Sequence, residues 1–478
     1  MDWWFEASRS KGTGIISSLS EVTGSSEAGI RLLLTLLLTY PSAFLHRKFL
    51  AKKEAELQHI FFILCGKDAI HSVVCIWVLH LNFLLGIPAV YTVAFQFTFQ
   101  MFYLLAGYYF TESDTYDIKW TMPHCVLTLR LIGIAFDVYD GTKKPEELSP
   151  EQKIRALKQT PSLLEILGHA YFPSSFVVGP QFPIRRYLEY TSRAYSHIFL
   201  DENECVRVGI IRGLLAFLYL GLHFLGVLYI PTDHVTTSAF TEKPFYIKLL
   251  LIGLWGKLNM SKYLACWLLA EGSCIVSGLA YNGKTPDGKN KWNGTCNIEL
   301  IPFETATQFS DMIRCFNINT NAWVASYVYK RLKWLKQKMV SHACALLFLA
   351  FWHGLHSGYY VTFLNEFIVI NVERDFYEMY DRSKWGQKPW RSLWVKVPCI
   401  MLKTVWLWCG LSYCVVPFLL FKTWKWVTVY SGVYWYIHII FILYPLYRGQ
   451  LKKAMGRMAH KDKDEPAVLN GLAHSHSH

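Results

Sequence analysis

The sequence predicts an all-α polytopic membrane protein with about eleven transmembrane helices. Its composition is 53% hydrophobic and only 17% charged, whereas soluble domains carry about a quarter of charged residues. Apolar runs of roughly 17 to 25 residues, the length that crosses a bilayer, recur along the chain. Neither strand alternation nor a repeat of solenoid period is visible, and we expect one helical membrane domain rather than several soluble ones.

The apolar runs give the expected order of the spans. The clear runs cover residues 30–46, 69–87, 89–110, 120–137, 208–230, 261–281, 342–369, 394–421 and 427–446. Weaker or interrupted runs, which we expect to form short broken or re-entrant helices, cover residues 57–65, 163–180, 245–258 and 322–335.

The two ends of the chain are polar and flank a single membrane domain. We expect a polar N-terminal tail over residues 1–27, the membrane domain over 28–447 and a C-terminal tail over 448–478. The N-terminal tail lacks the compact apolar core of a cleaved signal, so the first span is expected to act as an uncleaved anchor. We interpret the alternating His474, His476 and His478 as part of a flexible tail rather than a metal site.

Positive charge gathers in short segments between the apolar runs. The net charge is +13, and basic residues cluster at 46–53, 329–338 and 447–457. The positive-inside rule places these segments, and with them the C-terminus, in the cytosol. No separate basic domain exists, so nucleic-acid binding is not indicated.

Two histidines interrupt one of the most apolar runs, in the stretch FWHGLHSGYY at residues 351–360. Ionisable residues deep in a span are candidates for function, although a lone histidine bonded between helices is the ordinary alternative. Gly354 and Gly358 would let another backbone approach closely. No third ligand lies nearby, so a metal site is not expected. On a continuous helix, four polar side chains would share one face: His353, His356, Ser357 and Tyr360.

A second polar stretch lies upstream and combines asparagines with aromatic residues. Asn317, Asn319 and Asn321 crowd a few positions beside Phe316, and a basic segment follows directly. The interval between Asn317 and His353 is long enough for a short helix, a turn and half a span. The two residues can therefore meet inside the protein.

These two stretches together resemble the paired signature of the membrane-bound O-acyltransferase (MBOAT) family. FNINT supplies the family asparagine at Asn317, and FWHGLHSGYY supplies the family histidine at His353. Residues 116–133 and 319–324 are similar to the lysophosphatidylcholine acyltransferase branch, in particular its third type. The resemblance runs from about residue 30 to about residue 445 and implies the MBOAT fold, with spanning and broken helices around a central cavity.

The resemblance implies transfer of an acyl group, preferentially polyunsaturated, from acyl-CoA to the sn-2 hydroxyl of lysophosphatidylcholine. Lysophosphatidylethanolamine and lysophosphatidylserine are further expected acceptors, and phospholipid remodelling in the endoplasmic reticulum membrane is the expected setting. A thioester is already activated, so no covalent enzyme intermediate is required; no cofactor is expected, and acyl-CoA is a co-substrate. His353 would act as the general base. Asn317 would either hold the thioester carbonyl or orient the substrate, and the sequence leaves this choice open.

We assign binding roles to residues near Asn317 and His353. We expect the CoA phosphates to contact the basic segment, through Lys330, Arg331, Lys333 and Lys336. We expect the substrate pocket to include Trp352, His356, Tyr360 and Asn321. Asp117 and Lys119 are interpreted as a pair at the membrane surface.

Two other functions stay open at this point. A transporter would show matching broken helices in two halves, and no such symmetry is visible. An MBOAT enzyme acting on a protein or peptide would share Asn317 and His353, so only the branch-specific stretches favour a lipid acceptor. The sequence also leaves the oligomeric state open between a monomer and a homodimer.

Overall fold

The computed structural model describes residues 14–23, 25–66, 73–111, 118–192, 202–381 and 393–454. Within these ranges the chain is helical, and β-structure is limited to isolated bridges, one of which joins Ile298 to Phe316. From the N-terminus, the first helices are α1 (Ile15–Thr23), α2 (Glu27–Leu45), η3 (His46–Leu50), α3 (Ala55–Gly66), α4 (Val73–Leu84), α5 (Ala89–Phe110) and α6 (Thr121–Gly141).

Short helices follow α6, and capping residues in the sequence mark where two of them begin. Ser149 with Gln152, and Ser162 with Glu165, form capping boxes in which side chain and backbone satisfy each other. The elements in this part are η5 (Pro145–Glu147), α7 (Pro150–Arg155), α8 (Leu163–Ala170) and α9 (Ile184–Thr191).

The middle of the chain contains two long helices and a series of short ones. These elements are α10 (Glu202–Tyr229), η7 (Thr232–Thr236), α11 (Ser238–Thr241), α12 (Phe245–Ser277), α13 (Leu300–Glu304), α14 (Phe309–Cys315), α15 (Ile318–Val324), η8 (Ala325–Tyr329) and η9 (Lys330–Leu335). The last part comprises α16 (Lys338–His353), α17 (Ser357–Asp381), α18 (Leu393–Leu420), α19 (Thr423–Gly432), α20 (Tyr436–Ile442) and α21 (Tyr444–Ala454).

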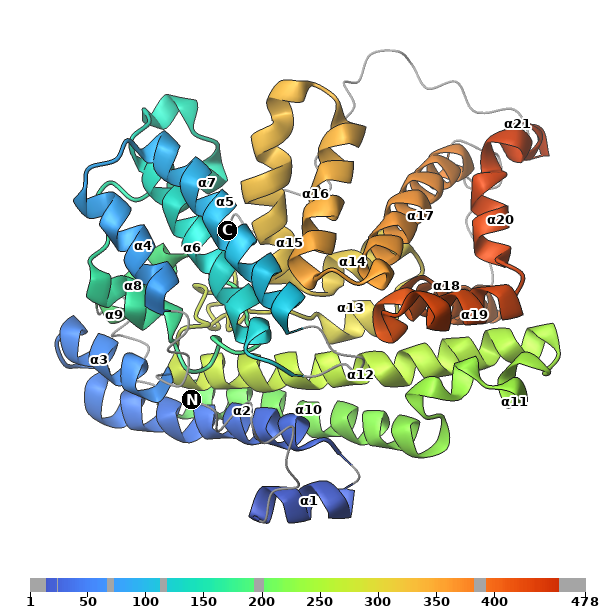
Figure 1. Ribbon diagram of the computed structural model, residues 1–478, viewed down its shortest axis with the longest axis horizontal. Helices are drawn as coiled ribbons and strands as arrows, with labels where there is room; N and C mark the ends of the chain where they lie inside the picture. Colours follow the sequence, from blue (N-terminus) through green and yellow to red (C-terminus); the bar gives the residue numbers. More distant parts are fainter. Residues whose placement is uncertain are drawn as a thin grey trace.

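Helices α2, α10 and α12 lie side by side and form a layer at the bottom of Figure 1. Helix α18 packs on α12, and α16 rises above this layer beside α5, while α17 packs against α16 and α18 on the other side (Figure 1). The signature residues are thus placed between the α12 layer and the helices above it.

Among the residues that the structure describes, five helical segments are long and apolar enough to cross a membrane: Glu27–Leu50, Ala89–Phe110, Thr121–Gly141, Glu204–Tyr229 and Ile400–Leu420. This agrees with an all-α membrane protein, and the count of about eleven spans stays a prediction. Several expected runs are shorter or divided in the structure. The run at 342–369 is divided between α16 and α17, and the run at 427–446 is divided among α19, α20 and α21.

Helix α12 is the opposite case, because it joins two runs that the sequence analysis kept apart. The prediction of a break between residues 258 and 261 is wrong for a physical reason. Asn259 Nδ2 donates to the Trp255 carbonyl at 2.9 Å, and Ser261 Oγ donates to the Lys257 carbonyl at 3.0 Å. These side chains bond back to their own helix, so the polar stretch continues as helix.

The expected bounds of the two tails stay predictions. Helix α21 runs from Tyr444 to Ala454 and so crosses the expected start of the C-terminal tail. Asp117 and the three histidines at 474, 476 and 478 lie outside the described residues. The cysteines that the structure does describe are free thiols.

Candidate active site

The chain turns sharply directly after His353. Helix α16 ends at His353, Gly354 has φ +139°, and α17 begins at Ser357. Side chains with a Cβ rarely adopt such a φ, so glycine suits the turn. The expectation that four polar residues would share one helical face is therefore wrong, because that face assumed a continuous helix.

His353 lies in an aromatic enclosure. Its ring centroid is 4.6 Å from Trp352, 5.0 Å from Phe418, 5.5 Å from Phe363 and 5.7 Å from Tyr359. Neither ring nitrogen of His353 has a hydrogen-bond partner among the residues that the structure describes, and the side chain is partly exposed. The imidazole is thus fixed by ring contacts while both nitrogens stay available to a substrate.

The other polar residues of the stretch point to different neighbours. His356 packs on Phe421 at 4.9 Å, and Tyr360 packs edge-on against Phe351 at 5.4 Å. Ser357 shares a hydrogen bond of 2.7 Å with Thr423. Of the predicted pocket residues in this stretch, His356 and Tyr360 therefore border different parts of the turn.

The close backbone approach expected at Gly358 is confirmed. A Cβ atom placed on Gly358 would lie 2.0 Å from the carbonyl oxygen of Pro417 in α18. The Gly358 N–H also donates to the Phe421 carbonyl at 3.2 Å. Glycine is therefore required here, and it lets the end of α18 close against the start of α17.

Trp352 anchors the end of α16 to two other helices. Its indole Nε1 donates to the Cys125 carbonyl in α6 at 2.9 Å. Its own carbonyl, left free by the helix end, accepts from the Tyr108 hydroxyl in α5 at 2.8 Å. The position of His353 therefore depends on helices α5 and α6 as well as on its own.

Asn317 also has an unusual backbone, with φ 50° and ψ 44°, and it caps helix α15. Asparagine tolerates this left-handed region better than most residues. The Asn317 carbonyl accepts from the N–H of Asn321 at 3.0 Å. The Asn321 side chain, a predicted pocket residue, donates to the carbonyls of Phe316 at 2.9 Å and Ile313 at 3.2 Å, so it stabilises the turn before α15.

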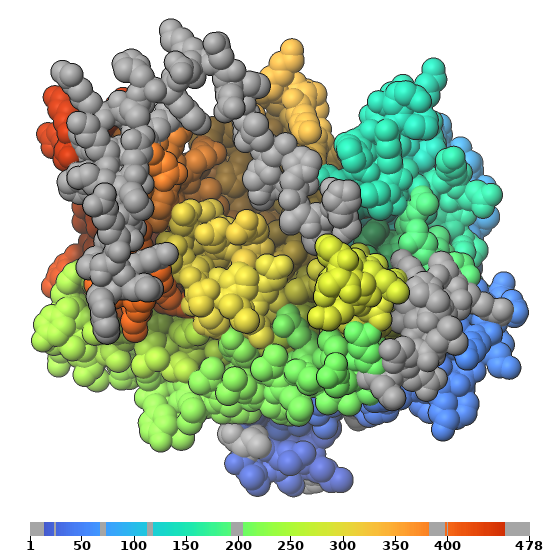
Figure 2. Space-filling model, turned by 180° about the vertical axis from the view of Figure 1, so that it is seen from behind, coloured from blue at the N-terminus to red at the C-terminus, as the bar shows by residue number. Residues whose placement is uncertain are grey.

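A loop residue that the sequence analysis missed contacts the start of α15. Asn297 donates through Nδ2 to Asn317 Oδ1 at 3.3 Å, and its Oδ1 accepts from the Asn319 N–H at 3.1 Å. In the view from behind, the yellow segment around residues 290–315 lies on the surface above the green α10 (Figure 2). Asn297 is buried in this segment, with 2% of its surface exposed.

A buried ion pair supports that loop. Glu271 of α12 accepts from the backbone N–H groups of Asn297 at 2.6 Å and Ile298 at 3.0 Å. Arg212 of α10 contacts the same carboxylate at 2.7 Å. A usable sequence signal existed, because Glu271 is an acid inside the apolar run that begins at residue 261, and such residues are functional candidates.

Helix α12 contacts the neighbourhoods of both His353 and Asn317. Phe418, which packs on His353, also contacts Tyr263 with centroids 6.1 Å apart. Phe316, directly before Asn317, contacts Trp267 at 4.7 Å. Tyr263 and Trp267 are four residues apart and so share a face of α12. The neighbourhoods of His353 and Asn317 thus border one helix face, a single turn apart.

The basic segment is partly engaged with acidic residues of α6 and α7. Arg331 contacts Asp140 through both terminal nitrogens, at 2.7 and 2.6 Å, and Lys330 pairs with Glu151. Lys333 and Lys336 are exposed, and neither forms an ion pair with an acidic residue in the described ranges. Of the four cations predicted to bind phosphate, Lys330 and Arg331 are therefore already paired with carboxylates, and Lys333 and Lys336 are not paired within the described ranges.

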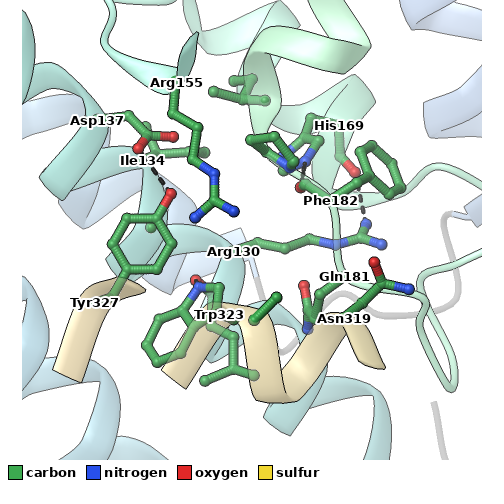
Figure 3. Close-up of a pocket in the computed structure, with 15 residues that line it drawn as sticks. Arg130, Ile134, Asp137, Arg155, His169, Gln181, Phe182, Asn319, Trp323 and Tyr327 are labelled. Atoms are coloured by element: carbon green, nitrogen blue, oxygen red, sulfur yellow. Dashed lines mark hydrogen bonds between the residues drawn. The ribbon is translucent and has the colours of Figure 1, made fainter. Parts of the chain in front are cut away.

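A pocket lies between helix α6, the residues around α8 and α9, and the stretch from α15 to Tyr327 (Figure 3). Asn319 lines it at one side, and Tyr327, three residues before Lys330, lines it at the other. Tyr327 donates to Asp137 at 2.7 Å, and the side chain of Arg155 points into the space between Asp137 and Arg130. The pocket is thus lined by polar groups from α6, the 155–181 region and α15.

The helical fold agrees with the comparisons with known proteins. Residues 105–413 match the membrane-bound O-acyltransferase family, and the chain belongs to that family. It is an acyltransferase, as the resemblance predicted.

Similarity to individual proteins narrows the class of acyltransferase. The chain is 38% identical over 448 residues to lysophospholipid acyltransferase 5 of Drosophila melanogaster, covering 91% of this chain and 89% of that protein. It is 38% identical over 449 residues to the human protein of the same name, covering 92% of both chains. Lysophospholipid acyltransferase of Saccharomyces cerevisiae is 28% identical over 377 residues, covering 72% of this chain and 60% of that protein.

Proposed function

We propose that this protein transfers a fatty acyl group from acyl-CoA to the sn-2 hydroxyl of lysophosphatidylcholine. The observation that carries the proposal is the match over about nine-tenths of the chain to enzymes named lysophospholipid acyltransferase 5. Lysophosphatidylethanolamine and lysophosphatidylserine are proposed as further acceptors, and polyunsaturated acyl-CoA as the preferred donor. We place the enzyme in the endoplasmic reticulum membrane with its C-terminus in the cytosol.

The proposed chemistry needs one base and one hydrogen-bond donor. A nitrogen of His353 takes the proton of the sn-2 hydroxyl while the hydroxyl oxygen bonds to the thioester carbonyl carbon. Asn317 Nδ2 donates to the carbonyl oxygen as negative charge develops there. The carbon–sulfur bond then breaks, and the proton passes from His353 to the sulfur, so CoA leaves as the thiol. The open nitrogens of His353 support this role.

We propose that the phosphates of CoA bind at the basic segment. Lys333 and Lys336 bind phosphate without breaking a described ion pair. Lys330 and Arg331 must exchange a carboxylate for the phosphate, and Arg331 would leave Asp140, of which 1% is exposed, without its charge partner. Lys333 and Lys336 are therefore the stronger candidates for the phosphate contacts.

The test is an acceptor panel with the purified protein in lipid nanodiscs. Polyunsaturated and saturated acyl-CoA are each supplied with lysophosphatidylcholine, lysophosphatidylethanolamine, lysophosphatidylserine and a serine-containing peptide. Release of CoA thiol and formation of acylated product are measured together. We expect equal amounts of thiol and diacyl phospholipid, with the fastest rate for lysophosphatidylcholine. Acylation of the peptide alone would assign the enzyme to the protein-modifying part of the family.

A further inference from the structure

We infer that Asn297 is a positioning residue that turns the carboxamide of Asn317 so that its NH₂ group faces the acyl donor. This inference rests on the proposed acyl transfer at His353 and Asn317, and it decides between the two roles that the sequence left open for Asn317. Hydrogen bonds fix the orientation of these carboxamides, beginning at a group whose direction is certain.

The backbone N–H of Asn319 provides that direction, because it can only donate. The side-chain atom of Asn297 at 3.1 Å from it must therefore be the oxygen. The same oxygen accepts from Asn319 Nδ2 at 3.2 Å. Asn319 Nδ2 in turn donates to the carbonyl of Cys296 at 2.8 Å, which fixes the Asn319 carboxamide as well.

The NH₂ group of Asn297 then lies at the opposite end of its carboxamide, 3.3 Å from the side chain of Asn317. An NH₂ group donates and does not accept, so Asn317 must present its oxygen to Asn297. Asn317 Nδ2 consequently faces away from Asn297, and within the described ranges it donates to no protein group. A donor held in this way suits a developing oxyanion, which a carboxamide oxygen would repel.

Asn297 is itself held by contacts from helices α10 and α12. Glu271 accepts from the backbone N–H of Asn297 and from the N–H of the next residue, Ile298. Arg212 donates to the carbonyl of Ile298. The Glu271 side chain is only 2% exposed, and Arg212 balances its charge. The ion pair between α10 and α12 therefore acts through Asn297 on the direction of Asn317.

The test compares two substitutions whose ranking depends on the role of Asn297. Asn297→Asp keeps the shape and the acceptor for Asn319, but it presents a charged oxygen to Asn317 and attracts its NH₂ group inward. Asn297→Ala removes the contacts without reversing them. We expect Asn297→Asp to lower kcat on the order of 10²-fold with both KM values nearly unchanged, and Asn297→Ala to lower kcat less.

A purely structural role predicts the reverse ranking, because aspartate preserves packing that alanine removes. Size-exclusion profiles and thermal unfolding of both variants are measured alongside the kinetics. Asn282→Asp, an isosteric change at a residue whose amide bonds Asn293 in the same loop region, is the matched control and should keep the original kcat. Equal or reversed kcat losses at residue 297 would overturn the inference.

The double variant Asn297→Ala/Asn317→Ala gives a second measurement that does not depend on the aspartate variant folding. If Asn297 acts through Asn317, the double variant has the kcat of Asn317→Ala alone. A further multiplicative loss would overturn the inference. These ratios are measured with whichever acceptor the unmodified protein uses, so a failure of the lysophosphatidylcholine assignment is distinguished from a failure of the positioning role.

Discussion

The neighbourhoods of Asn317 and His353 are built in opposite ways. Asn317 is held by directional hydrogen bonds that pass from Arg212 and Glu271 through Asn297. His353 is held by four aromatic rings and by a turn in the backbone, and its nitrogens bond to no described residue. One neighbourhood therefore controls the orientation of a group, and the other controls its location.

This difference predicts different responses to change. A hydrogen-bonded carboxamide can be misdirected by altering a partner that never touches the substrate. A ring held by packing keeps its position when a polar neighbour is altered. Its contribution is lost only when the ring itself is replaced or the surrounding backbone moves. The four predictions below test this contrast, beginning with the largest expected effect.

His353→Ala should remove most turnover while leaving the fold and substrate binding intact. Loss of a general base typically costs about 10²–10⁴-fold in rate, and it acts on the transition state rather than on the bound substrate. CoA release at saturating substrates measures the loss, with size-exclusion profiles to check folding. His356→Ala is the matched control and should reduce the rate only in part. A larger loss in His356→Ala than in His353→Ala would show that the base is the other histidine.

Asn317→Ala should lower kcat on the order of 10²-fold, because a donor to the developing oxyanion is removed. The double variant with His353→Ala should be little slower than either single variant, since both residues act on one reacting centre. Asn321→Ala is the control and should be milder, because its amide bonds the carbonyls of Phe316 and Ile313. Fully multiplicative losses in the double variant would contradict a shared centre.

Gly358→Ala should disturb His353 through packing rather than chemistry. The new methyl group would meet the Pro417 carbonyl oxygen at 2.0 Å, so α17 must move away from α18, at a cost of about 1–3 kcal/mol. We expect a lower Tm together with a lower kcat. Gly432→Ala is the control, since its nearest neighbouring atom is 3.6 Å away. An unchanged Tm in Gly358→Ala would contradict the tight contact between α17 and α18.

The combined change Lys333→Gln/Lys336→Asn should have the smallest effect. Asparagine is chosen at residue 336 because φ there is 53°, a region that asparagine tolerates. We expect a several-fold rise in the KM for acyl-CoA and an unchanged KM for the lysophospholipid, with the difference shrinking at high salt. Lys289→Gln, at an exposed residue of the 282–293 loop, is the control. Equal changes in both KM values would argue against a CoA contact.

The sequence predicted the elements of the site better than their arrangement. Hydropathy located most of the apolar runs, and the family resemblance is what points to Asn317 and His353, whose catalytic roles stay predictions. Hydropathy cannot report a backbone angle, so the turn at Gly354 was read as continuous helix. It also cannot report side chains that bond back to their own helix, so the continuity of α12 was missed.

Asn297 was missed for a different reason. It follows the conspicuous Asn293-Gly294-Thr295 stretch in a loop, and no local pattern separates it from ordinary loop asparagines. Its importance comes from contacts across 20 residues to Asn317 and across 26 residues to Glu271, which only the fold brings together. Applying the rule for intramembrane ionisable residues to Glu271 would have identified the other end of this network.

The turn at Gly354 has an electrostatic consequence for catalysis. Because α16 stops at His353, the imidazole lies at the negative end of the dipole formed by the aligned peptide groups of that helix. A cation at such a position is typically stabilised by about 0.3–1 kcal/mol, and by up to about 2 kcal/mol where it is partly buried. The imidazolium that forms when His353 takes the substrate proton would therefore find its counter-charge in the backbone of its own helix.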